Sequence, residues 1–140
     1  MGIYKDLNTI ERGSTQLYTR RITDTDFDLE DHMSGEVIFL AITGSTDITI
    51  TLPDAREGLN YTFINAVSPS GTGDAVITGT RITAMGAGDA DADGATLIPS
   101  SSVTVEAGSV GGERLEFVSD GLVWFCYAHQ QKVGSVTFAA

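Results

Sequence analysis

The sequence has very little of the residues on which cross-links, metal sites and nucleophilic catalysis depend. It contains one cysteine and two histidines in 140 residues. A single cysteine cannot form an intramolecular disulfide, and these three side chains cannot make a tetrahedral zinc site without help from carboxylates. Cys126 stands between Phe125 and Tyr127, which indicates a small buried hydrophobic residue. His129 follows three residues later, so in a strand the cysteine and the histidine point to opposite faces.

Basic residues are also scarce. Eight Lys and Arg stand against 19 Asp and Glu, for a formal net charge of −11. Nucleic acids and anionic membranes require a basic surface, so neither is expected as a direct partner. Half of the bases, Lys5, Arg12, Arg20 and Arg21, lie in the first 21 residues. Solubility explains the charge most simply, and the uneven distribution also fits an N-terminal segment that docks on an acidic partner.

Long apolar runs are absent. No run reaches the ~18 residues of a membrane-spanning helix, and residues 1–13 lack the apolar centre of a classical signal peptide. We therefore expect a soluble protein that is made in a cytoplasm. Proline is rare, with three residues, whereas glycine is frequent, with 16, and this combination favours many tight turns. The length suits one domain with a core of its own.

Short apolar segments with a period of two recur along the chain. They predict strands at residues 16–22, 35–43, 46–52, 60–66, 75–83 and 101–107, a hairpin within 113–128, and short pieces at 96–99 and 133–138. No helical pattern exceeds two turns. The sequence has no internal repeat of fixed period, so a propeller or a solenoid is not expected. The expected fold is all-β: a single β-sandwich or jelly-roll-like domain of about nine short strands over residues 16–140, behind an extended N-terminal arm of residues 1–15.

The hairpin is expected at the centre of the domain. Before the turn at Asp120-Gly121, the side chains of Leu115, Phe117 and Glu113 share one face. After the turn comes a continuous apolar run at 122–127, and such a run is typical of a strand that is covered on both faces. Gly79, inside the strand at 75–83, marks a bulge or a close approach of two backbones.

Two acidic segments resemble cation sites. Asp89, Asp91, Asp93 and Gly94 match the start of a calcium loop, but the twelfth position is Ser100 instead of a bidentate glutamate. A flexible, soluble loop is therefore preferred. The segment 24–31 has five carboxylates in eight residues and no fixed ligand spacing, so a solvated acidic connection is preferred there too. We expect no metal and no cofactor.

No catalytic motif occurs in the chain. There is no nucleophile elbow of the type G-x-S-x-G and no phosphate-binding glycine motif that opens a helix. An enzyme is therefore not expected, and no catalytic residue is assigned. The aromatic residues Tyr61, Phe63, Trp124 and Tyr127 are expected in the core, with an exposed platform for carbohydrate as the alternative.

Two segments resemble structural proteins of tailed bacteriophages. They are GEVIFLAITGSTDITITLPDAREGLNYTFINA at 35–66 and GERLEFVSDGLVWFCYA at 112–128. The shared pattern is a strand pair that ends in ITLP, a short turn, G-x-x-Y/F-x-F, and a late hairpin with S-D-G-x-x-W. It is similar to head decoration (cement) proteins and to head- or tail-fibre domains. The ending W-F-C-Y at 124–127 departs from the W-Y-V type that is usual in this group.

The resemblance implies a structural virion protein on the outer surface of the head, made in the host cytoplasm and often a homotrimer. Such a capsid decoration protein binds the assembled lattice of the major capsid protein and stabilises the head. The N-terminal arm would supply the contacts: Ile3, Tyr4, Leu7 and Ile10 as apolar anchors, and Arg12, Arg20 and Arg21 as partners of capsid carboxylates. The alternative is a tail-fibre or spike module that recognises a host-surface glycan. A cellular trimeric jelly-roll ligand is disfavoured by the lack of a signal peptide.

Overall fold

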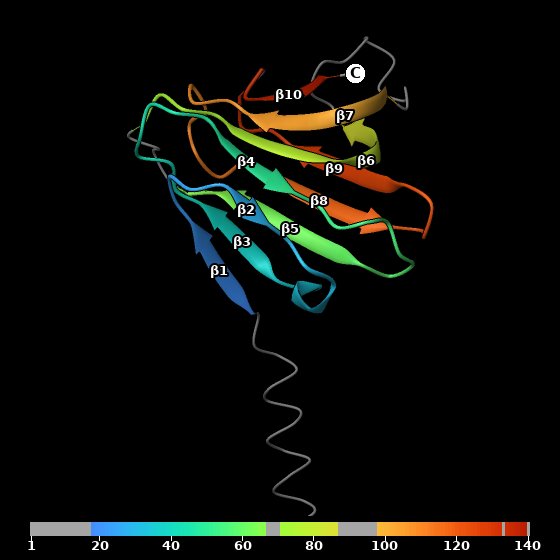
Figure 1. Cartoon of the computed structure of the whole chain (residues 1–140). Helices are drawn as coiled ribbons and strands as arrows, with labels where there is room; N and C mark the ends of the chain where they lie inside the picture. Colours follow the sequence, from blue (N-terminus) through green and yellow to red (C-terminus); the bar gives the residue numbers. More distant parts are fainter. Residues whose placement is uncertain (1–17, 67–70, 87–97, 133, 140) are drawn as a thin grey trace, which may run out of the picture.

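The computed structural model describes residues 18–66, 71–86, 98–132 and 134–139, and within these ranges the chain is all-β (Figure 1). A single 3-10 turn, η1 (Asp31–Met33), accompanies ten strands: β1 (Thr19–Ile22), β2 (Phe27–Asp28), β3 (Val37–Leu40), β4 (Ile48–Thr51), β5 (Asn60–Asn65), β6 (Ala75–Gly86), β7 (Ile98–Val105), β8 (Arg114–Ser119), β9 (Trp124–His129) and β10 (Val136–Ala139). The prediction of an all-β body is confirmed. In the described ranges no helix is long and apolar enough to cross a membrane. The predicted arm, residues 1–15, lies outside them.

The strands form two packed layers that share a corner. The first sheet contains β1, β3, β5, β8 and β9 in that order, and the second contains β2, β4, the first half of β6, the second half of β7, and β10. Figure 1 shows β2 and β4 in front of β3 and β5. The two sheets are continuous, because β6 connects β9 to β4, so the whole curls into a nearly closed, barrel-like sandwich.

Strand β6 makes the corner. Its residues 75–78 pair in parallel with β4, and its residues 82–86 pair in parallel with β9. The register with β7 shifts between Thr78 and Ile82, which confirms the bulge predicted at Gly79. A Cβ atom on Gly79 would lie 3.2 Å from the Cβ atom of Leu52, so the close approach favours glycine there. Arg81, in the same bend, has a φ of 57°, the left-handed region. Bulges of this kind let a strand pass from one sheet to the other.

The first six strands alternate between the sheets and stack in parallel. β1, β3 and β5 are parallel neighbours in the first sheet, and β2, β4 and β6 are parallel neighbours in the second. The result is a short parallel stack within a nearly closed sheet, with no repeat of the kind that builds a solenoid. Its connections differ in length, and therefore the sequence carries no fixed period. Five of the nine strand pairings are parallel, so the jelly-roll part of the prediction is not confirmed, because jelly rolls are antiparallel.

The core lies between the two sheets. Two aromatic residues of the first sheet cross it, and each bonds the backbone of the opposite layer. Trp124 Nε1 donates to the carbonyl of Pro53 at 3.0 Å, and the Tyr61 hydroxyl donates to the carbonyl of Glu30 at 2.9 Å. Their rings pack with centroids 5.6 Å apart. Amphipathic rings suit this position, because the ring is buried and its polar tip is satisfied.

The hairpin of β8 and β9 is central, as predicted, because it lies in the middle of the strand order β1-β3-β5-β8-β9-β6-β4-β2. Leu115, Phe117 and Glu113 point inward, and Phe117 packs edge-on against Phe63. The expectation that the apolar run at 122–127 is covered on both faces is wrong: Tyr127 is 40% exposed and Leu122 is 72% exposed. Among the described residues no layer covers the outside of the first sheet. Tyr127 is consequently the exception among the four aromatic residues predicted to lie in the core.

Candidate functional site

Several aspartates hold the fold together. Asp26, Asp47 and Asp74 each stand directly before a strand of the parallel stack in the second sheet, namely β2, β4 and β6. Asp26 accepts from the N–H of Thr49 at 2.7 Å, and Asp47 accepts from the N–H of Asp74 at 2.9 Å. Asp74 in turn accepts from the N–H of Ala107 at 2.7 Å. These carboxylates satisfy backbone donors at strand ends, which lack a ladder partner.

The segment 24–31 shows the same use of carboxylates. Asp24 accepts from the N–H groups of Thr43 and Gly44, both at 2.7 Å, and from the hydroxyl of Thr43. The segment also contains β2, which the prediction of a simple connection missed. In the part of the chain that the structure describes, no group of three or more His, Cys, Asp or Glu is placed to hold a metal ion. Asp89, Asp91 and Asp93 lie outside that part.

The hydrogen bonds of Asp24 predict a dependence of stability on pH. The Thr43 hydroxyl, followed by the N–H groups of Gly44 and Thr43, lowers the pKa of Asp24 below its ordinary value of 3.8. Because the pKa is lower in the folded state, this contribution to stability is complete above the unfolded value and is lost as the pH falls through the folded value. We expect Asp24→Asn to lower the melting temperature at about pH 6, and the difference from the parent chain to shrink as the pH falls below the unfolded value.

Thermal unfolding followed by circular dichroism across that range checks this expectation. Asp54→Asn is the matched control, since it removes the same charge from an exposed aspartate for which the structure shows no hydrogen bond within the described residues. If the difference in melting temperature between Asp24→Asn and the parent chain stays constant down to low pH, the ionised Asp24 carboxylate does not stabilise the fold in this way.

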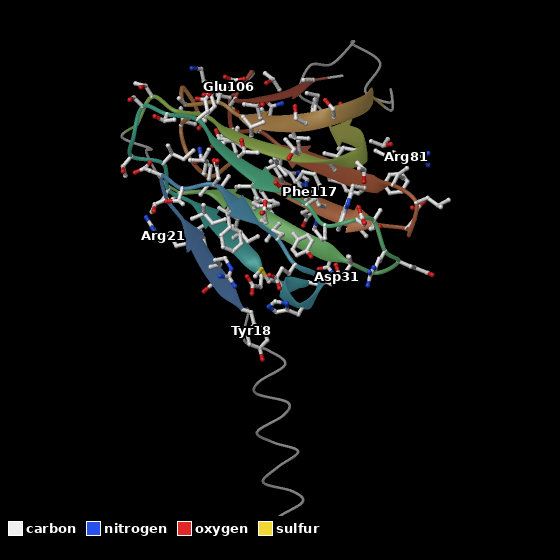
Figure 2. All side chains as sticks on the ribbon, in the orientation of Figure 1. Tyr18, Arg21, Asp31, Arg81, Glu106 and Phe117 are labelled. Carbon is white, nitrogen blue, oxygen red and sulfur yellow. The ribbon has the colours of Figure 1, made fainter. Side chains whose placement is uncertain are left out.

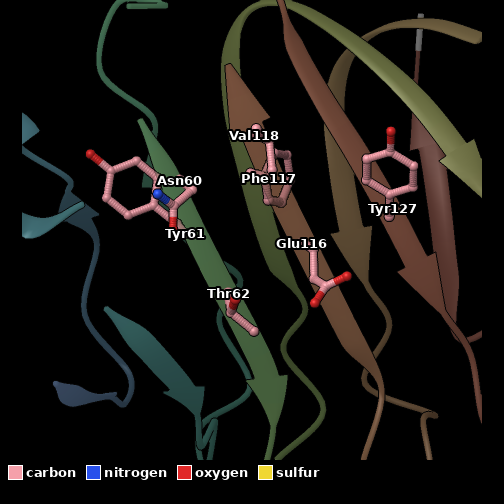
Figure 3. Close-up of a pocket in the computed structure, with 7 residues that line it drawn as sticks. All are labelled: Asn60, Tyr61, Thr62, Glu116, Phe117, Val118 and Tyr127. Atoms are coloured by element: carbon pink, nitrogen blue, oxygen red, sulfur yellow. The ribbon is translucent and has the colours of Figure 1, made fainter. Parts of the chain in front are cut away.

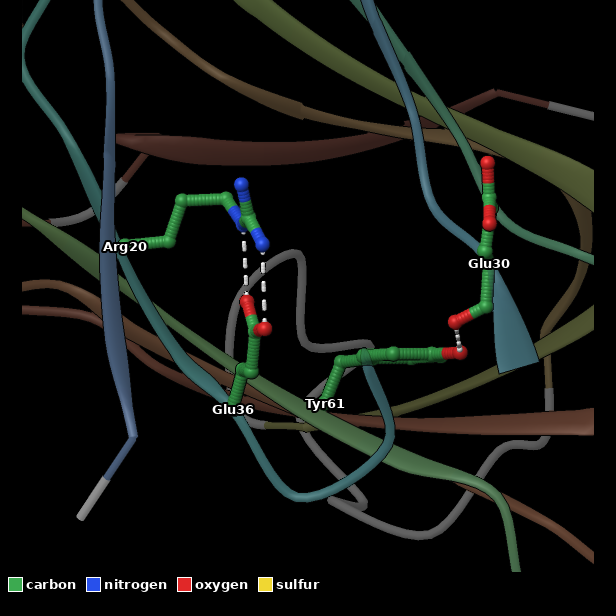
Figure 4. A network of polar contacts seen from close by, with 4 residues as sticks. All are labelled: Arg20, Glu30, Glu36 and Tyr61. Atoms are coloured by element: carbon green, nitrogen blue, oxygen red, sulfur yellow. Dashed lines mark hydrogen bonds and ion pairs between the residues drawn. The ribbon is translucent and has the colours of Figure 1, made fainter. Parts of the chain in front are cut away.

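Arg20 and Arg21, adjacent on β1, have different surroundings. The guanidinium of Arg20 binds Glu36 through two parallel hydrogen bonds of 2.8 and 3.0 Å (Figure 4). Its Cζ atom also lies 5.1 Å from the ring centroid of Phe27, across the open side of the sandwich. Arg20 therefore joins the two sheets where β1 and β2 leave the barrel unclosed. Arg21 is exposed and has no ion pair with a described residue, so it remains free for a partner (Figure 2).

The side chains capable of nucleophilic chemistry do not form a site. Cys126 is fully buried, and desolvation raises the pKa of its thiol. His129 is exposed on the opposite face of β9, as predicted, and His32 is exposed beside Glu30. Among the described residues the cysteine and the histidines therefore have no common pocket.

A buried polar cluster closes one end of the barrel. Glu113, at 1% exposure, accepts from Asn65 Nδ2 at 3.1 Å and from the N–H of Val110 at 3.3 Å. Asn65 Nδ2 also donates to the hydroxyl of Ser109. The backbone adds two bonds of 2.9 Å, from the Asn65 N–H to the Glu113 carbonyl and from the Gly112 N–H to the Asn65 carbonyl. The cluster anchors the β7–β8 loop to the end of β5, and its groups satisfy one another.

A shallow groove lies on the outside of the first sheet (Figure 3). It is lined by outward side chains of three neighbouring strands: Asn60 and Thr62 from β5, Glu116 and Val118 from β8, and Tyr127 from β9. Its volume is about 500 Å³. Glu116 is bound by Arg114 at 2.6 Å and lies 3.6 Å from Nε2 of His129. The groove can accept a partner through apolar contact and a few hydrogen bonds. The sequence could have indicated this groove, because the alternation of side chains along the hairpin places Val118 and Tyr127 at outward positions.

Of the predicted arm residues, Arg20 and Arg21 are described. Arg20 is held within the chain and Arg21 is free, whereas Ile3, Tyr4, Leu7, Ile10 and Arg12 lie outside the described ranges. No family model, no curated protein and no solved structure matches this chain.

Proposed function

We propose that this protein is a non-enzymatic virion component, a decoration (cement) protein that binds the assembled major capsid protein lattice on the outer surface of a phage head and stabilises it. The resemblance of residues 35–66 and 112–128 to such proteins carries the proposal. A stiff β body fits the role, because holding a shell together requires shape and contact area and no reactive group. Many copies on a symmetric shell act through avidity even where each contact is weak.

The binding element in this proposal is the N-terminal arm, with Arg21 at its base. The arm brings four apolar side chains, Ile3, Tyr4, Leu7 and Ile10, to a chain that is otherwise acidic, and Arg12 adds a cation. Exposed Arg21 continues this cationic character onto β1, the edge strand of the first sheet. A homotrimer is part of the proposal, since three arms would span the junction between capsid subunits.

Binding to purified expanded capsids tests the assignment. Deleting residues 1–15 is expected to abolish binding and to leave the β body folded. Arg21→Glu is expected to weaken binding by about tenfold or more, because one charge of the contact is reversed. Arg81→Glu is the matched control, since Arg81 is also exposed and lies on the opposite side of the molecule (Figure 2). Unchanged binding after the deletion, or equal loss in the two arginine variants, contradicts the proposal.

The second candidate is a tail-fibre or spike module that recognises a glycan on the host surface. The groove favours it, because Tyr127 offers an exposed ring beside the polar side chains of Asn60, Thr62 and Glu116. The number of copies in purified particles separates the two functions. A decoration protein is present in numbers comparable to the major capsid protein, whereas a fibre module is limited to the few copies that a tail carries.

A further inference from the structure

The two outer faces of the sandwich differ in composition. The outward positions of the second sheet are mainly hydroxyl-bearing, as expected for a solvated face: Thr49, Thr51, Thr78, Ser102, Thr104 and Thr137. The outward positions of the first sheet include six large apolar side chains, which we call the outer apolar face: Val37, Phe39, Ile64, Val118, Phe125 and Tyr127. The other outward positions of this sheet are polar or charged: Thr19, Arg21, Asn60, Thr62, Arg114, Glu116 and His129. The two outer faces therefore differ in how many large apolar side chains they present.

The pairing of the strands explains why the outer apolar face needs a cover. β1, β3 and β5 are parallel, and parallel sheets are almost always covered on both sides. The run at 37–42 in and after β3 is apolar without interruption, and so is the run at 122–127 around β9. Such runs are typical of strands buried on both faces. In the described part of the chain, only the inner sides of β3 and β9 have a covering layer. On the outer side, Tyr127 of β9 is 40% exposed and Val118 of the neighbouring strand β8 is 43% exposed.

Charge indicates what can cover this face. Two copies of a chain with a net charge of −11 repel each other, and the repulsion is smallest where neither copy presents an unpaired carboxylate. Among the outward positions of β1, β3, β5, β8 and β9, Glu116 is the one acid, and it is paired with Arg114 on the same strand. Arg21 and His129 lie at the two ends of the row that contains Arg114. The six apolar side chains therefore surround Thr62 and Glu116, and the one acid of the face is compensated.

We propose that the outer apolar face is the surface through which copies of this chain associate with one another. Like faces can meet about a symmetry axis, with Val118, Phe125 and Tyr127 contacting the apolar residues of the neighbouring copy. Association removes the remaining exposed apolar area of the first sheet from water and leaves the hydroxyl face of the second sheet outside. This association does not require the capsid, so it can be measured on the isolated chain.

Light scattering of the purified full-length chain, coupled to size-exclusion chromatography, tests this inference over a range of concentrations. The parent chain is expected to be an oligomer. Tyr127→Lys and Val118→Lys are each expected to weaken association by more than about tenfold, because a lysine ammonium would have to be buried in the contact. Thr51→Lys is the matched control, with the same added charge on the exposed face of the second sheet, and its association is expected to equal that of the parent. Circular dichroism verifies that each variant is folded.

A second measurement needs no variant. Hydroxyl-radical labelling of the parent chain at low and high concentration is expected to show protection of Tyr127 on association, whereas Tyr18, which is 76% exposed on the approach to β1, stays reactive. A parent chain that is monomeric at every concentration overturns the proposal, whether or not a glycan or a capsid protein then binds the groove. Lysine variants that remain oligomeric, or an equal loss in Thr51→Lys, overturn it as well.

Discussion

Replacing Trp124 by alanine is expected to lower the free energy of unfolding by about 3–5 kcal/mol, the largest effect of any single substitution considered for this chain. Trp124 is fully buried between the sheets and packs against Tyr61. Its removal leaves a cavity in the core and an unpaired carbonyl at Pro53. Because domains of this size are stable by roughly 5–15 kcal/mol, the variant is expected to lose much of its stability. Urea unfolding followed by far-ultraviolet circular dichroism measures the change.

Two further variants of the same hairpin sharpen this test. Trp124→Phe keeps most of the ring and loses the bond to Pro53, so a loss of about 1–2 kcal/mol is expected. Leu122→Ala removes a large apolar side chain that is 72% exposed at the turn, and its effect should stay within about 0.5 kcal/mol. Equal losses for Leu122→Ala and Trp124→Ala would be incompatible with a core centred on Trp124.

Replacing Glu113 by alanine is expected to cost about 2–4 kcal/mol, because the buried Asn65 amide loses a charged acceptor and the removed side chain leaves a gap. The Asn65 amide, in a residue that is 5% exposed, would lose the oxygen atom of Glu113 where water does not replace it. The Val110 N–H would lose its acceptor as well, in a residue that is 56% exposed. The β7–β8 loop would lose its anchor at the end of β5. Equilibrium unfolding in urea measures the loss, and hydrogen exchange at residues 108–112 shows whether the loop opens first.

Glu116, on β8, provides the control for Glu113. Glu116→Ala removes the same carboxyl group three residues later, from a surface pair with Arg114, and should change stability by less than about 1 kcal/mol. A double-mutant cycle with Asn65→Ala isolates the interaction of Asn65 with Glu113. The double variant is expected to lose less than the sum of the single losses, since neither group is then left unpaired. Strict additivity would show that the two side chains act separately.

These predictions also bear on the proposed function. A decoration protein must keep its shape on a particle, and both the Trp124 core and the Glu113 cluster hold segments that are distant in sequence. Neither lies on the outer apolar face or beside Arg21. Variants at these positions should therefore affect capsid binding only through loss of folded protein, whereas Arg21→Glu should affect binding in a chain that remains folded.

The sequence by itself determined where most of the strands are and which way their side chains point, although it missed β2. Alternation of apolar and polar residues is a local property, so the two faces of β4 and of β8 could be assigned without a structure. The turn at Asp120-Gly121 is local as well, since glycine takes the φ of 97° that this turn requires. Burial of Cys126 followed from its apolar neighbours.

The tertiary structure decided which strands are neighbours. Parallel stacking of β1, β3 and β5 depends on connections that cross from sheet to sheet, and their unequal lengths left no period in the sequence. The aspartates before β2, β4 and β6 were a signal of this stack, but without the pairing Asp26 was interpreted as part of a solvated acidic connection. Likewise, Asn65 and Glu113 meet only because β5 and β8 are antiparallel neighbours. Local chemistry sets the direction of each side chain, and only the closed sheet determines what that side chain meets.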